Sequence, residues 1–537
     1  MIRAQKRRIE SRQFWAAPWA GNPAINLRPR SLMSGASDGG AQEKTIPFSS
    51  LNVIPHAVFS DLSPAERLMF AGLQGLASLG AHPIYCIVDN FNNIPFYPMA
   101  AHLWLQDIDL PRDYLPEPWL LLERYPEIQG YILCDIANHP ESVNIATSLA
   151  GILQALPVDI SLQGPMNRLG YEQVADVRDW RFADFLGQYW SAINPEMAVE
   201  LSPSQLWGIR DFAVANGAVV MHGADQRNML LPLLNAPAAI YGGGPMDSLE
   251  KKAFVQSIGL HGGYHVPSEQ AFNLSTLAGL DVEPIPVPVI STPPITAQEP
   301  TDGAHVEAST VHVAFVVSDG DDLQWLLNRG DHDAWWGSAT RGDIPLGWTF
   351  SPALYRLAPT VWNYYMDTMT AQDEIICGAS GIGYCFDDIA FNEGFKGFLS
   401  QTGSFMAEAG IDLVAVFGNK FPDKPYLQGY TRQSAVKGVV YTSYSPWVVP
   451  LTTSPLSCNE KIIIPTSINL SGNVQQVVRQ ILDTPPSPAL YLIHVNAWSN
   501  DYRPLEMAHA VYDQIKDRVR VVKPSTLFAL AAGDMGA

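Results

Sequence analysis

The chain has 537 residues, of which 47% are hydrophobic, so it is long and apolar enough to bury at least two domain cores. Its 53 acidic residues against 33 basic ones give a formal net charge of −20, which repels a phosphate backbone and excludes nucleic acid as an expected partner. The five cysteines form no CxxC pair, so neither a zinc site of that type nor a redox motif is expected.

Residues 1–45 are rich in glycine, serine, asparagine and arginine without periodicity, which predicts a disordered lead-in. The basic start is not followed by the apolar run of a secretory signal, so we expect no export signal and a cytoplasmic location. No segment is apolar over the length of a membrane span. The sequence carries no signal for an oligomeric state.

Residues 46–282 alternate helix and strand patterns. A capping box from Ser63 to Glu66, with proline at the first helical position, starts the first of these helices. Alternating elements of this length predict an N-terminal α/β domain of Rossmann-like layers with parallel sheets. The predicted helices span residues 63–80, 141–156 and 202–217, and the predicted strands span residues 83–88, 131–134, 158–160 and 218–221.

A proline-rich stretch, residues 283–309, cannot form a helix or a central strand and predicts an extended linker. Residues 310–537 then carry about eight buried strand patterns, with helical patterns between most of them. This count favours a C-terminal (β/α) barrel-like catalytic domain of roughly 7–8 parallel strands. The predicted strands begin near Val311, Leu346, Glu374, Leu413, Gly438, Ile462, Leu490 and Val519.

The sharpest candidate site follows the first of these strands, where Asp319, Asp321 and Asp322 stand within four residues. In a barrel, ligands meet the carboxyl ends of the strands because the βα loops gather there. Carboxylates this close repel one another, which splits or raises their pKa values. Such groups serve as a general acid, a nucleophile, or ligands of Mg²⁺ or Ca²⁺. The structural alternative is a solvated turn in which Asp319 caps the next helix.

A second carboxylate pair, Asp387 and Asp388, follows the strand pattern near Glu374. Two carboxylate groups on one rim are what a glycosidase needs, one to protonate the leaving oxygen and one to act as nucleophile or base. Aromatic and polar residues on the same expected rim are typical of a saccharide cleft, since aromatic faces stack on sugar rings. The candidate substrate-binding residues are Trp335, Trp336, Gly381, Gly383, Tyr384, Tyr444, His494, Asn496 and Trp498.

Residues 381–387, which read GIGYCFD, resemble the motif that names the GxGYxYP family of proposed glycoside hydrolases. Both glycines and the first tyrosine are kept, whereas Phe386 and Asp387 replace the second tyrosine and the proline. The segments VVSDGDDLQWLLN and GWTFSPAL are similar to the family's C-terminal domain, and ESVNIATSLAGILQALPV and IRDFAVANGAVV to its N-terminal domain. The resemblance implies a sugar-processing context, and relatives are often exported. The site residues that match its pattern are Asp319, Asp321, Gly381, Gly383 and Tyr384.

Three hypotheses follow, each with a carbohydrate as the expected partner. The leading one is a glycoside hydrolase that uses carboxylates from the two acidic groups and needs no cofactor. The second is a metal-dependent hydrolase of the polysaccharide deacetylase type, with a divalent cation at Asp319 and Asp321. The third is a non-catalytic saccharide-binding protein in which the acidic run is structural. No zinc site is expected, because the rim offers no second histidine at ligand spacing.

Overall fold

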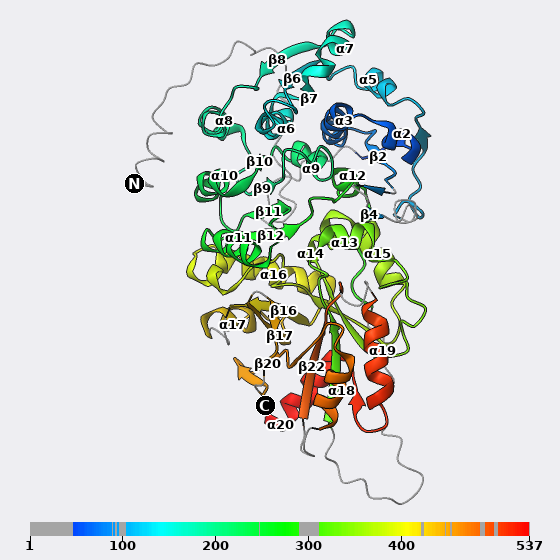
Figure 1. Ribbon diagram of the computed structural model, residues 1–537, viewed down its shortest axis with the longest axis vertical. Helices are drawn as coiled ribbons and strands as arrows, with labels where there is room; N and C mark the ends of the chain where they lie inside the picture. Colours follow the sequence, from blue (N-terminus) through cyan, green and yellow to red (C-terminus); the bar gives the residue numbers. More distant parts are fainter. Residues whose placement is uncertain are drawn as a thin grey trace, which may run out of the picture.

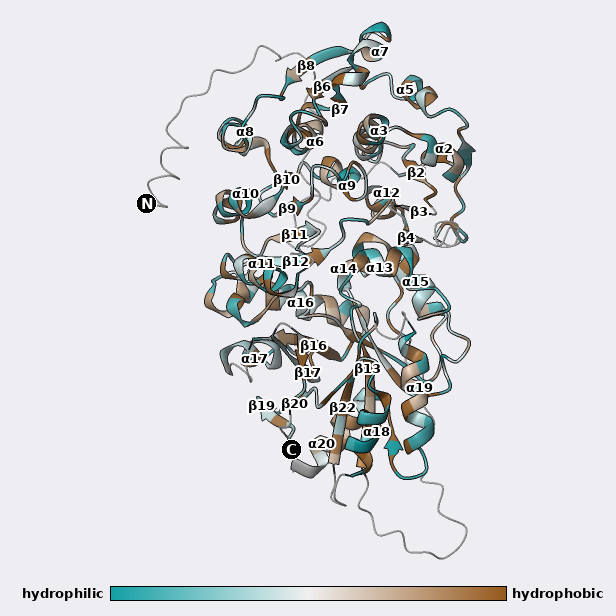
Figure 2. Cartoon of the chain, in the orientation of Figure 1, coloured by the Kyte–Doolittle hydropathy of each residue, from teal (hydrophilic) through white to brown (hydrophobic). Residues whose placement is uncertain are grey.

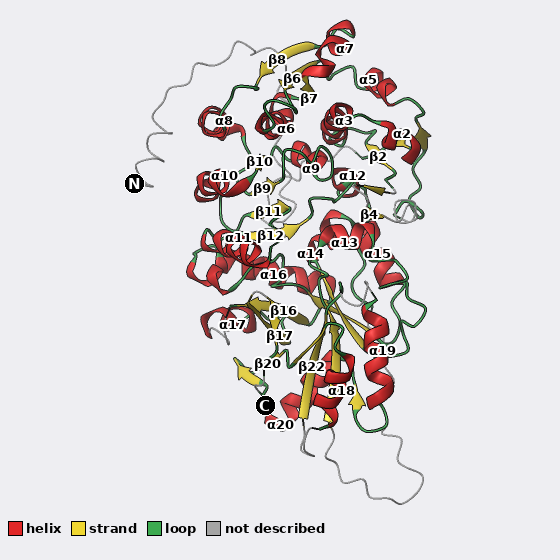
Figure 3. Ribbon diagram, viewed as in Figure 1, coloured by secondary structure: helices red, strands yellow, loops and turns green. Residues whose placement is uncertain are grey.

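The computed structural model describes residues 47–535 except residues 89, 92–93, 96–103, 246, 289–310, 420–423, 446, 452–453, 484–488 and 499–502. The chain is a mixed α/β protein with parallel sheets, which confirms that part of the prediction (Figure 3). Elements before residue 281 form the upper part of the molecule in Figure 1, and those after residue 310 form the lower part. The predicted lead-in, residues 1–45, lies outside the described residues. No helix in the described ranges is long and apolar enough to cross a membrane.

The N-terminal part is built from small parallel sheets with helices between their strands. Its strands are β1 (Leu51–Ile54), β2 (Ile84–Cys86), β3 (Asn90–Phe91), β4 (Ile94–Pro95), β5 (Arg112–Tyr114), β6 (Gly130–Cys134), β7 (Ala155–Asp159), β8 (Glu172–Asp176), β9 (Met197–Glu200), β10 (Val219–Met221), β11 (Ala239–Gly242) and β12 (Tyr264–Pro267). The parallel sheets have the orders β2-β1-β5, β7-β6-β8 and β10-β9-β11-β12, and β3 and β4 form an antiparallel pair. In the last sheet, β10 lies on one side of β9 and β11 lies on the other, so the chain crosses from one side of β9 to the other between β10 and β11. At such a switch point α/β sheets open a crevice at their carboxyl edge.

Helices cover these sheets, and α3 (Pro64–Ala77) follows the predicted capping box. Ser63 Oγ accepts from the amide of Glu66, and the Glu66 side chain accepts from the amide of Ser63 at 2.9 Å. The N-terminal helices are α2 (His56–Asp61), α3 (Pro64–Ala77), α5 (Leu121–Arg124), α6 (Glu141–Leu153), α7 (Gln163–Arg168), α8 (Phe182–Tyr189), α9 (Arg210–Ala215), α10 (Gly223–Leu230), α11 (Ser248–Leu260) and α12 (Leu274–Leu277), with 3-10 turns η1 (Pro118–Leu120), η2 (Ile160–Leu162), η3 (Trp190–Ala192) and η4 (Leu231–Leu233).

The helix predicted to start at Ser202 begins instead at Arg210, so that start is wrong. Gly208 interrupts the helical pattern, since it adopts a left-handed φ of 76°. A Cβ atom at Gly208 would also lie 2.1 Å from the carbonyl oxygen of Glu269, so the chain passes too close to its neighbour for any side chain. The proline and serines at residues 202–204 therefore form a turn before the helix.

After residue 310 the described strands join one large sheet. Its strands are β13 (Val311–Val317), β14 (Leu346–Phe350), β15 (Asp373–Cys377), β16 (Leu413–Gly418), β17 (Gly438–Ser445), β18 (Trp447–Val449), β19 (Leu456–Cys458), β20 (Lys461–Pro465), β21 (Ile468–Leu470), β22 (Ala489–Val495) and β23 (Arg520–Val521). The hydrogen-bonded order is β19-β20-β17-β16-β15-β14-β13-β22-β21, with β18 beside β17 and β23 beside β13. From β20 to β21 every neighbouring pair along this path is parallel.

Helices also connect most strands of this sheet. They are α13 (Leu323–Asn328), α14 (Pro352–Leu357), α15 (Pro359–Asp367), α16 (Phe395–Ala409), α17 (Lys424–Thr431), α18 (Val474–Leu482), α19 (Pro504–Ile515) and α20 (Pro524–Met535), with the 3-10 turn η5 (Asp387–Phe391) after β15. In Figure 2 the strands are largely brown, whereas helices such as α18 and α19 carry teal on part of their surface. The sheet is thus apolar and its helices are amphipathic, as expected when helices cover a parallel sheet.

The start of the predicted linker packs on the C-terminal part. Trp362 Nε1 donates to the carbonyl of Ile285 at 2.7 Å, and the amide of Val287 donates to the carbonyl of Ala409 at 2.7 Å. Residues 289–309 of that linker lie outside the described residues. The predicted domain boundaries remain predictions.

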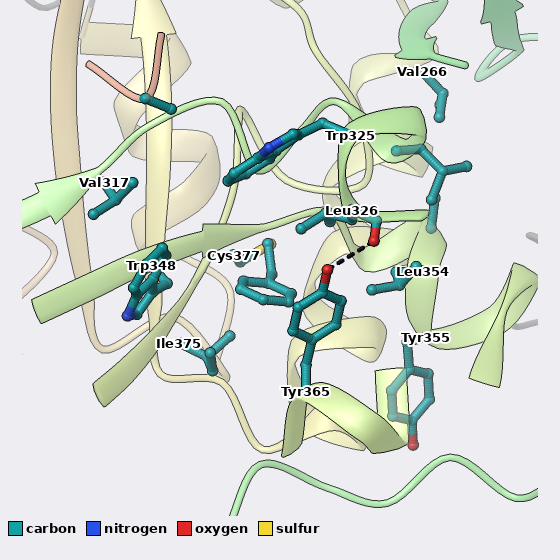
Figure 4. Packing of buried hydrophobic residues seen from close by; sticks show 14 of the residues in the cluster. Val266, Val317, Trp325, Leu326, Trp348, Leu354, Tyr355, Tyr365, Ile375 and Cys377 are labelled. Atoms are coloured by element: carbon teal, nitrogen blue, oxygen red, sulfur yellow. Dashed lines mark hydrogen bonds between the residues drawn. The ribbon is translucent and has the colours of Figure 1, made fainter. Parts of the chain in front are cut away.

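One apolar core extends across both parts of the chain. Figure 4 shows Val266 of β12 in the same cluster as Trp325 and Trp348 of the C-terminal part. Within that cluster Tyr365 donates its hydroxyl to the carbonyl of Leu326 at 2.7 Å, the dashed line in Figure 4. The carboxyl edge of the large sheet therefore packs directly against the N-terminal part.

Candidate functional site

The acidic run begins at the carboxyl end of β13, where close contacts fix its backbone. Gly320 has no room for a side chain, because a Cβ atom there would lie 1.4 Å from the carbonyl oxygen of Thr349. The Gly320 amide donates to Thr349 Oγ1 at 3.0 Å. Asp319 adopts a left-handed φ of 67°, and its carboxylate accepts from Ser318 Oγ. The loop therefore holds its carboxylates in set positions against β14.

Asp322, and not Asp319, caps the helix that follows. Asp322 Oδ1 accepts from the amide of Trp325 at 3.2 Å as the N-cap of α13. This corrects the turn alternative, in which Asp319 was the cap. Asp319 and Asp321 instead border a cavity, so the run divides into one structural carboxylate and two at a site.

Two carboxyl groups of the run hold protons more tightly than ordinary aspartates. Burial and the charge of Asp319 raise the pKa of Asp321 to about 6, although Lys251 acts in the opposite direction. Burial and the charges of Glu269 and Asp321 raise the pKa of Asp322 well above its usual range. A carboxyl group with a pKa near 6 can donate a proton at mildly acidic pH, as a general acid must.

A cavity of about 20 Å³, enough for one water molecule, lies beside the run. Its walls come from residues in or just after β13, β14, β15, β16, β17, β20 and β22, so the sheet curves around it. The site is thus set at the carboxyl ends of these parallel strands, as predicted for the acidic run. The lining residues are Val316, Ser318, Asp319, Asp321, Thr349, Ala379, Ala415, Phe417, Val440, Thr442, Thr466, Leu492 and His494.

His494 presents a free lone pair at this cavity. Its Nδ1 lies 3.2 Å from Asn469 Oδ1, and its buried Nε2 has no hydrogen-bond partner among the described residues. Because an amide oxygen only accepts, this contact places the ring proton on Nδ1 and leaves Nε2 as an acceptor. Burial lowers the pKa of His494 against the attraction of Asp319, which favours the neutral ring.

The GIGY segment forms a joint between the two parts of the chain. The amide of Tyr384 donates to the carbonyl of His265 at 2.7 Å, and the amide of His265 donates to the carbonyl of Tyr384 at 2.9 Å. A Cβ atom at Gly383 would lie 2.2 Å from Cδ2 of Tyr264, so only glycine lets β12 approach. Gly381 has φ 104° and packs on Thr402. Close backbone approach therefore explains both glycines, which were predicted to bind substrate.

Tyr384 and Tyr444 lie beside the acidic run. The Tyr384 ring packs edge-on against Phe386 at 5.3 Å and Phe417 at 5.5 Å between centroids. Burial raises the pKa of Tyr384 well above its usual range, with added effects from the charges of Tyr444 and Asp321. Both phenols therefore keep their protons, and both remain candidates to donate to a ligand.

The second pair, Asp387 and Asp388, is held at a different place. Asn419 Nδ2 donates to Asp387 Oδ1 and to Asp388 Oδ2, each at 2.7 Å. Gln256 Nε2 of α11 donates to Asp388 Oδ2 at 3.1 Å. Burial raises the pKa of Asp387, against its bonds with Asn419. In the described part of the chain, neither residue lines the cavity that Asp319 and Asp321 border.

Trp335 and Trp336 lie in the core, so the prediction that this pair forms a binding surface is wrong. Their exposed fractions are 3% and 2%. Trp335 Nε1 donates to the carbonyl of Ala497 at 2.8 Å, and Trp336 packs edge-on against Trp348 at 5.2 Å. The guanidinium of Arg341 lies 4.2 Å from the centre of a Trp336 ring. The segment after α13 therefore folds inward to cover β14 and β15.

Asn496 and Trp498 follow β22 and are partly exposed. Asn496 Oδ1 accepts from the amide of Trp498 at 2.9 Å. The Trp498 ring packs edge-on against Trp325 at 5.8 Å and Trp335 at 5.7 Å. Both residues thus lie at the carboxyl end of a strand beside the core, where they remain candidates for ligand contact.

The N-terminal part supplies charged residues that the sequence did not reveal. Lys251 of α11 interacts with the charges of Asp319, Asp321 and Asp322, and Glu269, just after β12, faces Asp322. Lys251 stands in the sequence LEKKAF, where a lysine is typical of the solvated face of a helix. The packing of α11 and β12 on the C-terminal part brings it to the site, so no local signal identified it.

Among the residues that the structure describes, no group of three or more His, Cys, Asp or Glu side chains is placed to hold a metal ion. A divalent cation at Asp319 and Asp321 therefore remains a prediction from the sequence.

Two family models match the chain. The first, described as “GxGYxYP putative glycoside hydrolase C-terminal domain”, matches residues 309–532. The second, described as “GxGYxYP_N second domain”, matches residues 128–193. Together they cover more than half of the chain, and the first contains the acidic run and the GIGY segment.

A solved structure described as a “putative hydrolase from Bacteroides thetaiotaomicron” is similar along nearly the whole chain. It is 22% identical with a TM-score of 0.76, and the similarity covers 92% of this chain and 96% of that one. A 4-alpha-glucanotransferase from Thermococcus litoralis is 13% identical over 41% of this chain and 38% of its own, with a TM-score of 0.28 that is too low to indicate a shared fold. No curated protein matches the chain. The two family matches show that the chain belongs to the GxGYxYP family.

Proposed function

We propose that this chain hydrolyses a glycosidic bond and that Asp321 and Asp319 are its reactive carboxylates. The observation that carries the proposal is their position on one cavity at the carboxyl end of β13, where the pKa of Asp321 is raised to about 6. Glycosidases act through a pair of carboxyl groups, one of which keeps its proton. The description of the matched C-terminal family model supports the same class of substrate.

In this proposal Asp321 is the general acid and transfers its proton to the glycosidic oxygen as the bond to the anomeric carbon breaks. Asp319, as a carboxylate, stabilises the positive charge that develops on the sugar, as nucleophile or as base for the attacking water. His494 Nε2 accepts a hydrogen bond from that water or from a sugar hydroxyl. Tyr384, Tyr444, Asn496 and Trp498 bind the sugar, and the reaction needs no cofactor.

We also propose that the large sheet closes into a (β/α) barrel between β20 and β21, below Rossmann-like N-terminal layers. Thr466 donates its amide to the carbonyl of Tyr441 in β17 at 2.8 Å, and the next amide, of Ser467, donates to Leu492 in β22 at 3.0 Å. Consecutive residues thus bond to β17 and to β22, which lie toward opposite ends of the strand order. The cavity walls, drawn from strands all along that order, support the closure.

Asp321→Asn, assayed on a glycan panel that the wild-type protein cleaves, tests the function. We expect kcat/KM to fall about 10²–10⁴-fold, the usual effect of losing a general acid. Asp225→Asn, which alters an exposed carboxylate on α10, is the matched control and should be fully active. Full activity of Asp321→Asn would overturn the proposal.

Asp388→Asn decides between the two acidic groups. Asp388 is bound by Asn419 and Gln256 and does not line the cavity, so we expect less than a tenfold loss. Dialysis against a chelator should leave activity unchanged in the same assay. A larger loss with Asp388→Asn than with Asp321→Asn would move the chemistry to the second pair.

A further inference from the structure

The carboxyl edges of two separate sheets meet at this site. In the N-terminal part, β11 leads into α11 and β12 leads to Glu269, so Lys251 and Glu269 both follow the carboxyl ends of their strands. In the C-terminal part, β13 leads to Asp321 in the same way. The paired backbones of His265 and Tyr384 hold the two edges together, and α11 and β12 lie at the boundary in Figure 1.

Two lysines of α11 carry positive charge at this meeting point. Lys252 Nζ donates to the carbonyl of Tyr444 at 3.4 Å, and Lys251 Nζ lies 6.0 Å from the centre of the Tyr384 ring. Burial lowers the pKa of Lys251, but the charges of Asp321, Asp319 and Asp322 outweigh that effect, so its pKa is raised. In the described ranges no ion pair within 4 Å joins Lys251 to these carboxylates. The charge of Lys251 therefore acts on all three carboxyl groups of the acidic run and is not neutralised by a single partner.

Other titratable groups face the same ammonium group from each element around it. The pKa of Tyr444, at the end of β17, is influenced by the charges of Lys251, Asp319 and Asp321. Asp247, just before α11, influences it as well. His265 of β12 has a pKa lowered to about 3 by burial and by the charge of Lys251, so it stays neutral. The ammonium group is thus set against an excess of carboxylates.

We propose that Lys251 is a positioning residue of the active site, through which the N-terminal part places a positive charge beside the carboxylates of the acidic run. The inference rests on the proposed hydrolytic function of Asp321 and Asp319. It assigns the site to both parts of the chain, so the C-terminal sheet alone is incomplete. The required property at residue 251 is a positive charge at the right distance, because an ammonium lowers the cost of ionised carboxylates beside a protonated one.

Lys251→Met and Lys251→Arg test this proposal, with Lys396→Met on the exposed side of α16 as the matched loss of charge. With Met, we expect kcat to fall about tenfold or more while KM changes little. The alkaline limb of the pH–rate profile, which reports loss of the Asp321 proton, should rise by about one pH unit. Arg should restore most of the rate and the original limb, and Lys396→Met should match wild type.

The same variants are also compared without substrate, by thermal unfolding between pH 4 and pH 8. Loss of Lys251 leaves the carboxylates unbalanced, so the Met variant should lose more stability than wild type as the pH rises, and Arg should restore it. If this difference appears while Asp321→Asn is fully active, the proposed function fails, but the charge interaction of Lys251 with the acidic run stands. An unchanged pH–rate profile and an unchanged pH dependence of unfolding in Lys251→Met would overturn the inference.

Discussion

Asp321 couples the proposed chemistry to the stability of the fold. Its pKa of about 6 in the folded chain compares with roughly 4 for an aspartate in an unfolded chain. The folded state therefore binds this proton more tightly. The contribution of Asp321 to folding stability is fully present below about pH 4 and is lost as the pH rises through about 6. A carboxylate that is costly to ionise lowers the stability of the folded state, and active sites commonly keep such groups because function requires them.

Asp321→Asn should therefore stabilise the protein at alkaline pH while it abolishes activity. Asparagine removes the ionisation, so we expect a gain of about 1–3 kcal/mol at pH 8 and almost none at pH 4. Thermal unfolding of wild type and variant at both pH values measures the difference. Asp225→Asn, at an exposed position on α10, is the control for the substitution itself. Equal unfolding temperatures of Asp321→Asn and wild type at pH 8 would contradict the assignment of a raised pKa.

At this scale the sequence located the acidic run but not its electrostatic environment. Asp319 and Asp321 were found because a buried strand pattern ends just before them, and the carboxyl end of a parallel strand is where sites form. Lys251 escaped because it lies about 70 residues earlier, in a helix whose own pattern accounts for a lysine. Its proposed role depends on packing between parts of the chain that are far apart in the sequence, which no local pattern encodes.

Among the elements, the GIGY segment shows how a family motif can serve packing. Each predicted strand of the C-terminal part begins within one residue of an observed strand, because buried parallel strands read as short apolar runs. The motif after β15 was taken for a binding loop, yet its glycines admit Tyr264 and Thr402. The tryptophan pair was misplaced for a related reason, since a loop position does not reveal that the loop folds inward.

Gly383→Ala tests this packing role. The added methyl group would lie 2.2 Å from the Tyr264 ring and 3.1 Å from the carbonyl oxygen of His265, so the joint must shift. We expect a loss of about 1–3 kcal/mol, typical of overpacking. Gly187→Ala in α8 is the control, because nothing lies within 4 Å of its Cβ position and alanine favours a helix by about 1 kcal/mol. Chemical denaturation measures both; equal stability of the two variants would show that the joint tolerates a side chain.

For the whole molecule, the sequence indicated a mixed α/β chain with parallel sheets, but not how the sheets meet. Strand patterns define elements, and β13 to β17 pair in the order in which they occur in the chain, whereas the pairing of β13 with β22 joins strands far apart in the sequence. The change of neighbour at Thr466 and Ser467, between β20 and β21, has no signature in the amino-acid pattern. The same holds for the bridge from His265 to Tyr384, which joins the two parts of the chain beside the acidic run.

For the proposed hydrolase, the net charge of −20 and the carboxylates around Lys251 together disfavour acidic glycans as substrates. A substrate rich in uronic acid would be repelled during its approach and again at the site, where Lys251 already faces several carboxylates. Neutral glycans of the same linkage carry no such penalty. We therefore expect a neutral glycan to be cleaved with a lower KM than its carboxylated analogue at low ionic strength.

Salt separates this electrostatic effect from a difference in fit. The screening length falls from about 30 Å at 0.01 M to about 3 Å at 1 M salt, so added sodium chloride should lower KM for the carboxylated glycan and leave KM for the neutral one nearly constant. Michaelis constants for both glycans across that range make the test, with thermal unfolding in each buffer to exclude an effect on folding. A KM for the carboxylated glycan that rises with salt would indicate an attractive cationic subsite instead, because screening weakens attraction and repulsion alike.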